Sequence, residues 1–565
     1  MCFRPGCIVK AARWVKGWPL PTSAETTHRP ELIFGLVGGV GVRLDDLSQH
    51  LKQQLDSFGY KVVDIRLSNL LVNFTGWTDQ KEKTEYGRVR HLQEMGNALR
   101  RRLEDGAALA RAGIAEIRMK RAAISGDPDS PIVAHAYVLH QLKHPDEVDL
   151  LRQVYGSSFF LVAGHAPRAI RAAKLCERMA GKESQTGKES SFLSKAHELI
   201  EIDEKENDDF GQNTRDAYPK ADFFANLSLS LGEYEVRRFV DLVFGHPFRT
   251  PSREEYAMYQ ASAASLRSSD DNRQVGAAIV TLTPEGSGDK TPDIIAVGVN
   301  EVPRRGGGSY WDKDSPDYRD QALLQSGVDR ARDLKISALA ELIDKIRQKD
   351  WLQAKLAENT PSDLAGMLLQ DIKRTQFMEI GEFSRPVHAE MAALIDSARR
   401  GVAVNGHAMY VTTFPCHNCA KHIIAAGLRK VVYLEPYPKS RANNLYPEEI
   451  DLESPDGKNL EGKVVFSAFT GIGARQYGRL FSMSERGAKK GKSLKSWEAG
   501  RKSLSPLYVS RNDSLAYLAA ERQELAKLPP EIYSWDTAKV CPNFGRASRA
   551  ESPNSKDGET GQTTS

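Results

Sequence analysis

The feature that most restricts the fold of this chain is a histidine–glutamate pair followed, further along, by two close cysteines. His388 and Glu390 stand in the sequence H-A-E, and Cys416 and Cys419 stand in P-C-H-N-C. Zinc in proteins prefers four ligands, and a catalytic zinc site keeps one position for water. His388, Cys416 and Cys419 would supply three ligands, and Glu390 would reach the water without binding the metal. Such a site requires a fold that brings the two segments together.

Both segments are predicted to begin helices. Cys416 and Cys419 are three residues apart and follow Pro415, so they share one face of a first helical turn, where the helix dipole favours thiolates. His388 likewise begins a helix. A zinc knuckle or a reactive thiol pair is the alternative for an isolated C-x-x-C, but the upstream H-A-E favours catalysis. Glu390 would then carry a proton from water to a leaving amine.

The length of the chain indicates more than one folded unit. At 565 residues it exceeds one ordinary core, so two domains with tails are expected. The net charge of +4 does not demand a polyelectrolyte partner, and no apolar run is long enough to cross a membrane. Its six scattered cysteines fit a reducing, cytoplasmic setting better than a disulfide framework.

Sequence patterns also predict the domain limits. We expect a flexible extension at 1–30, an α/β domain at 31–248 and a second α/β domain at 252–480. A charged helical insertion is expected at 305–376, and a basic, polar, partly disordered tail at 483–565. The first domain opens with a strand, a glycine turn, a helix and a strand, which is the start of a doubly wound α/β fold.

The glycine turn of the first domain, GLVGGVGVRL, lies between the predicted strand and helix. That context suits a loop that binds phosphate through backbone N–H groups. The lysine and Ser/Thr of a full P-loop are replaced by Val42 and Arg43, which argues against phosphoryl transfer. Glycine turns also form for packing alone, and both interpretations stay open. The candidate nucleotide-binding residues are Gly35, Gly38, Gly39, Gly41, Val42 and Arg43.

Four stretches of the second domain resemble the deoxycytidylate deaminase branch of the cytidine deaminase-like superfamily. They are NRQVGAAIV at 272–280, VGVNEVPR at 297–304, VHAEMAAL at 387–394 and TTFPCHNCAKHIIAAGLRKVVY at 412–433. The resemblance implies a three-layer α/β/α fold with a mixed sheet and a substrate contact by Asn300. The sequence NEVPR after that asparagine and the long insertion depart from simple members of the branch. Arg304 and Arg305 in this loop either pair with phosphate or lie in solvent.

With the first domain included, residues 31–480 resemble bacterial antiviral deoxycytidylate deaminases, whose amino-terminal domain is P-loop-kinase-like. The stretches that carry this resemblance are GLVGGVG, RVRHLQEMGNALR, LKHPDEVDLLRQVYG and DFGQNTRDAYPKADFFANLS. It implies conversion of dCTP, and in some members dCMP, to uracil nucleotides, which depletes the pool that a phage needs. It also implies a regulatory first domain with a nucleotide ligand, restraint by an inhibitory RNA, and a homo-oligomer.

Three other functions remain compatible with the sequence. A housekeeping dCMP deaminase with a regulatory domain would carry the same zinc residues. A polynucleotide cytosine deaminase is supported only by the basic segment at 485–503. A nucleotide sensor that keeps zinc for structure alone would not need Glu390, so that residue argues for an enzyme.

Overall fold

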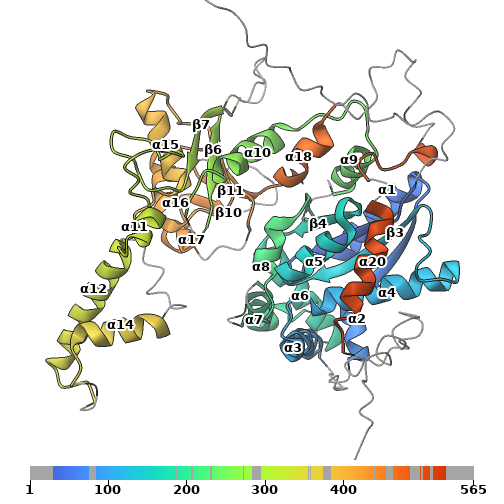
Figure 1. The fold of residues 1–565 in the computed structure, drawn as a ribbon, viewed down its shortest axis with the longest axis horizontal. Coiled ribbons are helices and arrows are strands. Elements are labelled where there is room, and N and C mark those ends of the chain that lie inside the picture. The colour runs from blue at the N-terminus through green and yellow to red at the C-terminus, as the bar shows by residue number, and fades with distance from the viewer. Residues whose placement is uncertain are drawn as a thin grey trace, which may run out of the picture.

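The computed structural model describes residues 29–74, 84–184, 187–204, 206, 208–228, 232–270, 273–282, 294–353, 356, 358–372, 383–436, 440–452, 462–483, 497, 501–509 and 513–529. Most of the expected extension at 1–30, and the tail beyond residue 529, lie outside these ranges. The described residues form two α/β units, each on a six-stranded sheet (Figure 1). The predicted class of two α/β domains is confirmed. Among these residues, none of the helices is both long and apolar enough to span a membrane.

The first sheet has the strand order β12-β5-β4-β1-β3-β2. Strands β1 to β5 are parallel to their neighbours, and the short β12 pairs antiparallel with β5. The parallel direction follows from the chain, because a helix separates each strand from the next. The strands are β1 (Leu32–Val37), β2 (Lys61–Arg66), β3 (His135–Leu142), β4 (Phe159–His165), β5 (Phe223–Asn226) and β12 (Gly471–Ile472).

Helices cover both faces of this sheet. Alternate residues of β1 point to opposite layers, as the pleat requires. Leu32, Phe34 and Leu36 pack with α1 (Leu44–Ser57) and α9 (Gly232–Val243). Ile33 and Val37 pack with the opposite layer, which contains α4 (Ala108–Ser125) and α5 (Pro145–Tyr155). Further helices of this unit are α2 (Leu67–Leu70), α3 (Glu85–Leu103), α6 (Arg168–Lys182), α7 (Leu193–Glu204) and α8 (Thr214–Ala217).

The second sheet is mixed, with the order β10-β11-β9-β8-β6-β7. Strand β6 runs antiparallel to β7 and β8, whereas β8, β9, β11 and β10 are parallel. The strands are β6 (Gly276–Val280), β7 (Ile294–Val299), β8 (Ala408–Val411), β9 (Lys430–Tyr433), β10 (Ile450–Leu452) and β11 (Val464–Ala468). The parallel β8 and β9 therefore end at the same edge of the sheet.

The second unit has three layers. On one face, α10 (Arg253–Ser265) packs Ala257 and Ala261 with Ala278 and Tyr410 of the sheet. On the other, α15 (Ala389–Arg399) and α16 (His417–Ala425) pack against the alternate residues, such as Ala277 and Met409. The small helix α17 (Ala442–Leu445) contacts α16. This α/β/α arrangement agrees with the predicted layers.

The predicted insertion contains three described helices: α11 (Asp320–Gln325), α12 (Arg330–Arg347) and α14 (Pro361–Asp371). Helices α12 and α14 project away from the rest of the second unit (Figure 1). They pack on each other through a small apolar cluster of their own, which includes Leu339, Ile343 and Leu364. The insertion therefore carries its own core.

The end of the chain returns to the first unit. Strand β12 joins β5, and α18 (Ala474–Phe481) and α20 (Asp513–Leu525) follow it. Helix α20 lies beside α4 and α5 (Figure 1). The sequence predicted that the second domain ends at 480 and that a polar tail begins at 483. In the structure β12 pairs with β5 of the first unit, α18 contacts both α9 of the first unit and α10 of the second, and α20 contacts α4 and α5. The position of α20 could not be predicted, because its charged residues look solvent-exposed in the sequence. Their partners are buried arginines far away in the chain.

Candidate active site

The helix that carries the H-A-E motif sits directly on strand β7. A Cβ atom on Gly298 would overlap the carbonyl oxygen of Ala389 and the backbone nitrogen of Ala393. Only a glycine permits this approach of helix and strand. Val387 also forms a bridge with Glu301, just past the end of β7. The start of α15 is thereby held against the loop that contains Asn300.

The structure brings the three predicted metal ligands together. His388 is the N-cap residue of α15, and Cys416 is the N-cap residue of α16. The Nδ1 atom of His388 lies 3.3 Å from the sulfur of Cys416 and 3.3 Å from the sulfur of Cys419. The three ligand atoms all lie within 4.8 Å of one another. Two helix N-termini thus converge on one point, as the sequence predicted.

This donor set fits zinc. Usual zinc–sulfur and zinc–nitrogen bond lengths place tetrahedral N and S ligands about 3.5 Å apart, close to the separation found here. Two sulfurs and one imidazole leave a fourth position, which is the pattern of a catalytic site. In the described ranges, no other set of three histidine, cysteine or carboxylate side chains is close enough to hold a metal. His417 and His422 do not join the group.

Electrostatics around the ligands prepare Cys416 for metal binding and hold protons on His388 and Cys419. The hydrogen bond with Cys419 lowers the pKa of the Cys416 thiol to about 4, so Cys416 is a thiolate at neutral pH. The hydrogen bond with Cys416 raises the pKa of His388 to about 9. Cys416 also raises the pKa of Cys419. A metal ion must therefore displace protons from His388 and Cys419 as it binds, which makes its affinity pH-dependent.

Glu390 lies in the first turn of α15 and is 3% exposed. Burial raises the pKa of its carboxyl above the ordinary value. The charges of Cys416 and His388 also act on it, and its carboxyl interacts with the side chain of Cys419. His388 is exposed, so the group is open to solvent on that side. A carboxyl group beside the ligands, and not among them, is the placement that a proton carrier requires.

Asn300 lies at the end of β7, and its side chain holds the loop before β6. Its Oδ1 accepts a hydrogen bond from the backbone of Val275 at 2.6 Å, and its Nδ2 donates to the carbonyl of Arg273 at 2.7 Å. Nδ2 also donates to Asp270 at 3.3 Å, and the charge of Asp270 acts on His388. Both amide hydrogens of Asn300 are thus engaged within the protein. Asn300 stands near the site, and its observed contacts are with the protein itself.

The loop arginines do not form a phosphate clamp in this structure. The guanidinium of Arg304 lies 3.5 Å from the carboxylate of Asp314. Arg305 is exposed. Their placement agrees with the solvent-exposed alternative.

A buried carboxylate that the sequence patterns did not reveal lies at the edge of this site. Glu435 comes just after β9 and is 3% exposed. It accepts a hydrogen bond from the hydroxyl of Thr413, which precedes Cys416 in the loop after β8. The position of Glu435 in the sequence, directly after a strand, could have indicated it. A residue that follows one parallel strand lies at the same edge of the sheet as the residues that follow the neighbouring strand.

The glycine-rich turn of the first domain is only partly a loop. Gly35 lies inside β1 and packs against Leu142 and Phe159, and the side chain of Val42 is buried in the core. Gly38 and Gly39 follow the strand, and Gly41 has a φ of +89°, which favours glycine. Arg43 precedes α1 and pairs with Asp46.

A carboxylate of the protein already binds this turn. The backbone N–H of Val40 donates to Asp203 at 2.8 Å. Lys143, just past the end of β3, lies 2.7 Å from the same carboxylate and donates to the carbonyl of Gly38 at 2.9 Å. Beside the turn is a cavity of about 480 Å³. Its walls carry a majority of cationic over anionic side chains, including Arg43, Arg66, Arg88, Lys143, Lys174 and Arg178.

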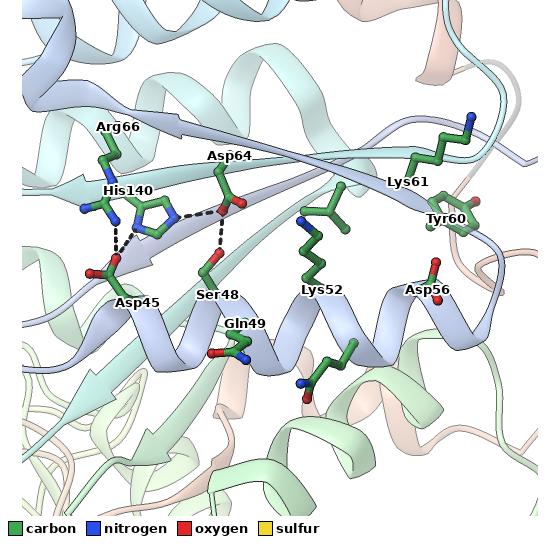
Figure 2. Close-up of a pocket in the computed structure, with 12 residues that line it drawn as sticks. Asp45, Ser48, Gln49, Lys52, Asp56, Tyr60, Lys61, Asp64, Arg66 and His140 are labelled. Carbon is green, nitrogen blue, oxygen red and sulfur yellow. Dashed lines mark hydrogen bonds and ion pairs between the residues drawn. The ribbon is translucent and has the colours of Figure 1, made fainter.

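A second hollow of the first unit lies between α1 and β2, with a volume of about 830 Å³ (Figure 2). Asp64 accepts hydrogen bonds from Ser48 at 2.5 Å and from His140 at 3.0 Å, and His140 also lies near Asp45. Although serine, histidine and aspartate meet here, Ser48 binds the carboxylate rather than the imidazole. The arrangement is therefore not that of an activated nucleophile, which needs the base next to the hydroxyl.

The comparisons with known proteins concern the second unit. Residues 251–435 match the family model described as the cytidine and deoxycytidylate deaminase zinc-binding region. This range contains His388, Glu390, Cys416 and Cys419. Zinc is thus the metal to which the ligand geometry and the matched family both point.

Individual relatives match over shorter stretches. The deoxycytidylate deaminase of Enterobacteria phage T2 is 46% identical over 55 residues, which is 10% of this chain and 29% of that protein. The ComE operon protein 2 of Bacillus subtilis (strain 168) is 44% identical over 54 residues, 10% of this chain and 29% of that protein. The human deoxycytidylate deaminase is 43% identical over 47 residues, 8% of this chain and 25% of that protein. This chain therefore spans less than a third of the length of these curated relatives.

Among solved structures, the dCMP deaminase of cyanophage S-TIM5 in complex with dCMP and dUMP is 18% identical. The match covers 39% of this chain and 98% of that chain, with a TM-score of 0.20. The apo form of the same enzyme is 16% identical. The match covers 39% of this chain and 99% of that chain, with a TM-score of 0.19.

Proposed function

We propose that this protein is a zinc-dependent deaminase of free deoxycytidine nucleotides. The observation that carries the proposal is the convergence of His388, Cys416 and Cys419 beside the buried carboxyl of Glu390. A zinc ion held by these three residues would supply a Lewis acid that activates water at neutral pH. The family match over the same residues supports a reaction on a cytosine ring.

Glu390 moves the protons in this proposal. Its carboxylate takes a proton from the attacking water, first protonates the pyrimidine ring at N3, and then helps deliver a proton to the amino group at C4. Water adds its oxygen at C4, and the C4–N bond breaks to release ammonia and leave uracil. The buried position of Glu390 excludes competing water, so the proton stays between the carboxyl and the substrate.

Asn300 acts as an organiser of the site in its observed position. Its side chain links the backbone of Val275 and Arg273 with Asp270, and so sets the shape of the loop before β6. We propose that this loop borders the nucleotide. A direct hydrogen bond from Asn300 to the substrate would require one of these contacts to be exchanged.

The proposed substrate is dCTP, with dCMP as a second substrate. Support for dCTP comes from the resemblance of residues 31–480 to antiviral deaminases, and it extends to depletion of the nucleotide pool in antiviral defence in the cytoplasm. Restraint by an inhibitory RNA and a homo-oligomeric state belong to the same proposal. A housekeeping dCMP deaminase is the second candidate, and the curated relatives named deoxycytidylate deaminase favour it.

The first domain is proposed to bind a nucleotide and regulate the enzyme. The cationic walls of the cavity beside Gly38, Gly39 and Gly41 support an anionic ligand. Asp203 holds the N–H of Val40 that a phosphate would use, so the ligand must displace this carboxylate. The ammonium group of Lys143 would then pair with the phosphate in place of Asp203.

The test compares the wild-type protein with Glu390→Ala on dCTP, dCMP and a single-stranded oligodeoxynucleotide. We expect the wild type to convert a free nucleotide and to leave the oligonucleotide unchanged. The variant should keep its zinc, measured by elemental analysis, and lose at least about 100-fold in kcat, the range for loss of a general acid–base. Full turnover by the variant would remove Glu390 from the reaction. Conversion of the oligonucleotide alone would move the substrate class to polynucleotides.

A further inference from the structure

Glu435 is a buried carboxylate with partners from two loops of the deaminase site. Its Oε2 atom accepts a hydrogen bond from the hydroxyl of Thr413 at 3.2 Å and forms an ion pair with Arg273. Thr413 lies in the loop after β8 that leads to Cys416. Arg273 lies in the loop before β6 whose carbonyl and amide groups bind Asn300. Glu435 therefore ties together the two loops that border the metal ligands.

The third partner of Glu435 comes from the other unit. Arg215 belongs to the short helix α8 of the first domain, and its Nε atom lies 3.7 Å from Oε1 of Glu435. The side chain of Arg215 is 14% exposed, whereas that of Arg273 is 52% exposed. The two guanidinium groups are close enough that burial and the charge of Arg215 together lower the pKa of Arg273. Arg215 is thus the more buried of the two cations that face this carboxylate.

A buried carboxylate depends strongly on its partners. Removal of Arg215 would leave Arg273 as the one cation of the two beside the carboxylate of Glu435, and the surrounding groups would then move to compensate for the lost charge. Here Thr413 and Arg273 would shift with Glu435. Asn300 would shift as well, because its side chain is bound to the backbone of Arg273. A residue outside the deaminase unit is therefore in contact with a group that joins the two loops of its site.

Helix α8 also contacts the carboxylate that binds the glycine turn of the first domain. Thr214, the first residue of α8, has its hydroxyl 3.4 Å from the carboxylate of Asp203. Asp203 is the group bound by the N–H of Val40 and by Lys143. Arg215 is the next residue in the chain, so one short helix contacts both Asp203, which binds the glycine turn, and Glu435.

We propose that Arg215 is a positioning residue of the deaminase site, supplied by the first domain and acting through Glu435. The proposal rests on the proposed function for its kinetic effect. It concerns the arrangement of the two loops and not the reacting atoms. It makes the deaminase site dependent on the docking of the first domain.

The experiment compares Arg215→Ala and Arg215→Lys with a matched control, Lys220→Ala, in the full chain. Lys220 lies close by in the first domain and pairs with Asp149, away from Glu435. We expect Arg215→Ala to lower kcat/KM by about tenfold, within the coupling range of contacting charged residues. Arg215→Lys should recover part of this loss, and Lys220→Ala should match the wild type. Zinc content should be the same in all three.

Hydrogen–deuterium exchange gives a readout that needs no turnover. The amide of Val275 donates to Asn300, so Arg215→Ala should speed exchange in the peptides that cover 273–282 and 408–416. Glu435→Gln should speed exchange in the same peptides. Arg215→Ala should add little more in the Glu435→Gln background, because that background already lacks the ion pair through which Arg215 acts.

Equal exchange and equal kcat/KM in Arg215→Ala and Lys220→Ala would overturn the proposal. Full additivity with Glu435→Gln would do the same, since Arg215 would then act elsewhere. If Arg215→Ala does not fold, the same comparison is made with Arg215→Gln. A wild-type protein that converts no deoxycytidine nucleotide would instead defeat the proposed function, and the exchange measurements would still decide the role of Arg215.

Discussion

At the scale of the residue, Cys416 shows how one side chain can both cap a helix and belong to a group able to hold a metal. As the N-cap of α16 it accepts a hydrogen bond from the backbone N–H of Cys419 at 3.4 Å. The same hydrogen bonding and the helix N-terminus favour its thiolate form. Pro415 before it and the spacing to Cys419 are local features, which is why the sequence alone predicted this half of the site.

Glu235 of α9 presents the opposite case, a carboxyl whose pKa burial raises to about 7. Desolvation raises its pKa from 4.5 to about 7, although the N–H of Asn226 and the charge of Arg238 act in the other direction. The nearby carboxylate of Glu255 raises it further. Between these two pKa values the folded protein binds more protons than the unfolded chain, so stability must fall as pH rises from about 4.5 to about 7.

The substitution Glu235→Gln should remove this part of the pH dependence. We expect the variant to gain stability relative to wild type as pH rises from 5 to 8, because glutamine has no charge to bury. Urea-unfolding midpoints at several pH values would measure the difference. Glu233→Gln, at an exposed position in the same helix, is the control and should follow the wild type. A constant difference between Glu235→Gln and wild type across this range would contradict the prediction.

At the scale of the element, the contact between α15 and β7 decides where His388 and Glu390 stand. The backbone of α15 touches the strand at Gly298, where no side chain fits. The sequence predicted both the helix and the strand from their apolar pattern. Their closeness was not predicted, because a glycine in a strand can equally mark a bulge or a sharp bend.

Gly298→Ala should push α15 away from the sheet. We expect a loss of about 1–3 kcal/mol in the free energy of unfolding, typical of overpacking, together with weaker zinc binding. Competition with a chelator would measure the zinc affinity. Gly366→Ala is a suitable control, because a Cβ atom at this position in α14 meets nothing within 4 Å. Unchanged zinc affinity in Gly298→Ala would show that α15 is held by other contacts.

At the scale of the whole molecule, the carboxyl-terminal helix α20 completes the first domain. Glu521 is fully buried and pairs with Arg118 at 3.1 Å and Arg121 at 2.8 Å. Glu31, directly before β1, pairs with the same Arg121 at 2.9 Å. Residues near the two ends of the described chain thus meet in one ion cluster. The second unit is therefore inserted between segments that belong to the first.

Glu521→Ala should therefore destabilise the first domain. Two buried guanidinium groups would lose a carboxylate, which costs about 3–5 kcal/mol. The zinc content should stay the same, because the metal ligands lie in the other unit. Calorimetry would show the lower unfolding transition, and Arg522→Ala, an exposed neighbour that pairs with Asp129, should leave it nearly unchanged. An unaltered transition in Glu521→Ala would mean that α20 is dispensable for the first domain.

The closeness of the three candidate metal ligands, the helices that begin at them and the two α/β units could all be predicted from the amino-acid sequence. These features arise from short-range chemistry: cap residues, the spacing of ligands and the apolar periodicity of strands and helices. Three other features became visible only in the folded chain: Glu435 joins two loops, Arg215 reaches it from the other unit, and α20 returns to α4. Each of them depends on charged residues that are buried only because their partners, distant in the chain, are buried with them. The sequence around a single charged residue does not indicate whether its side chain will be solvated or will form a buried ion pair.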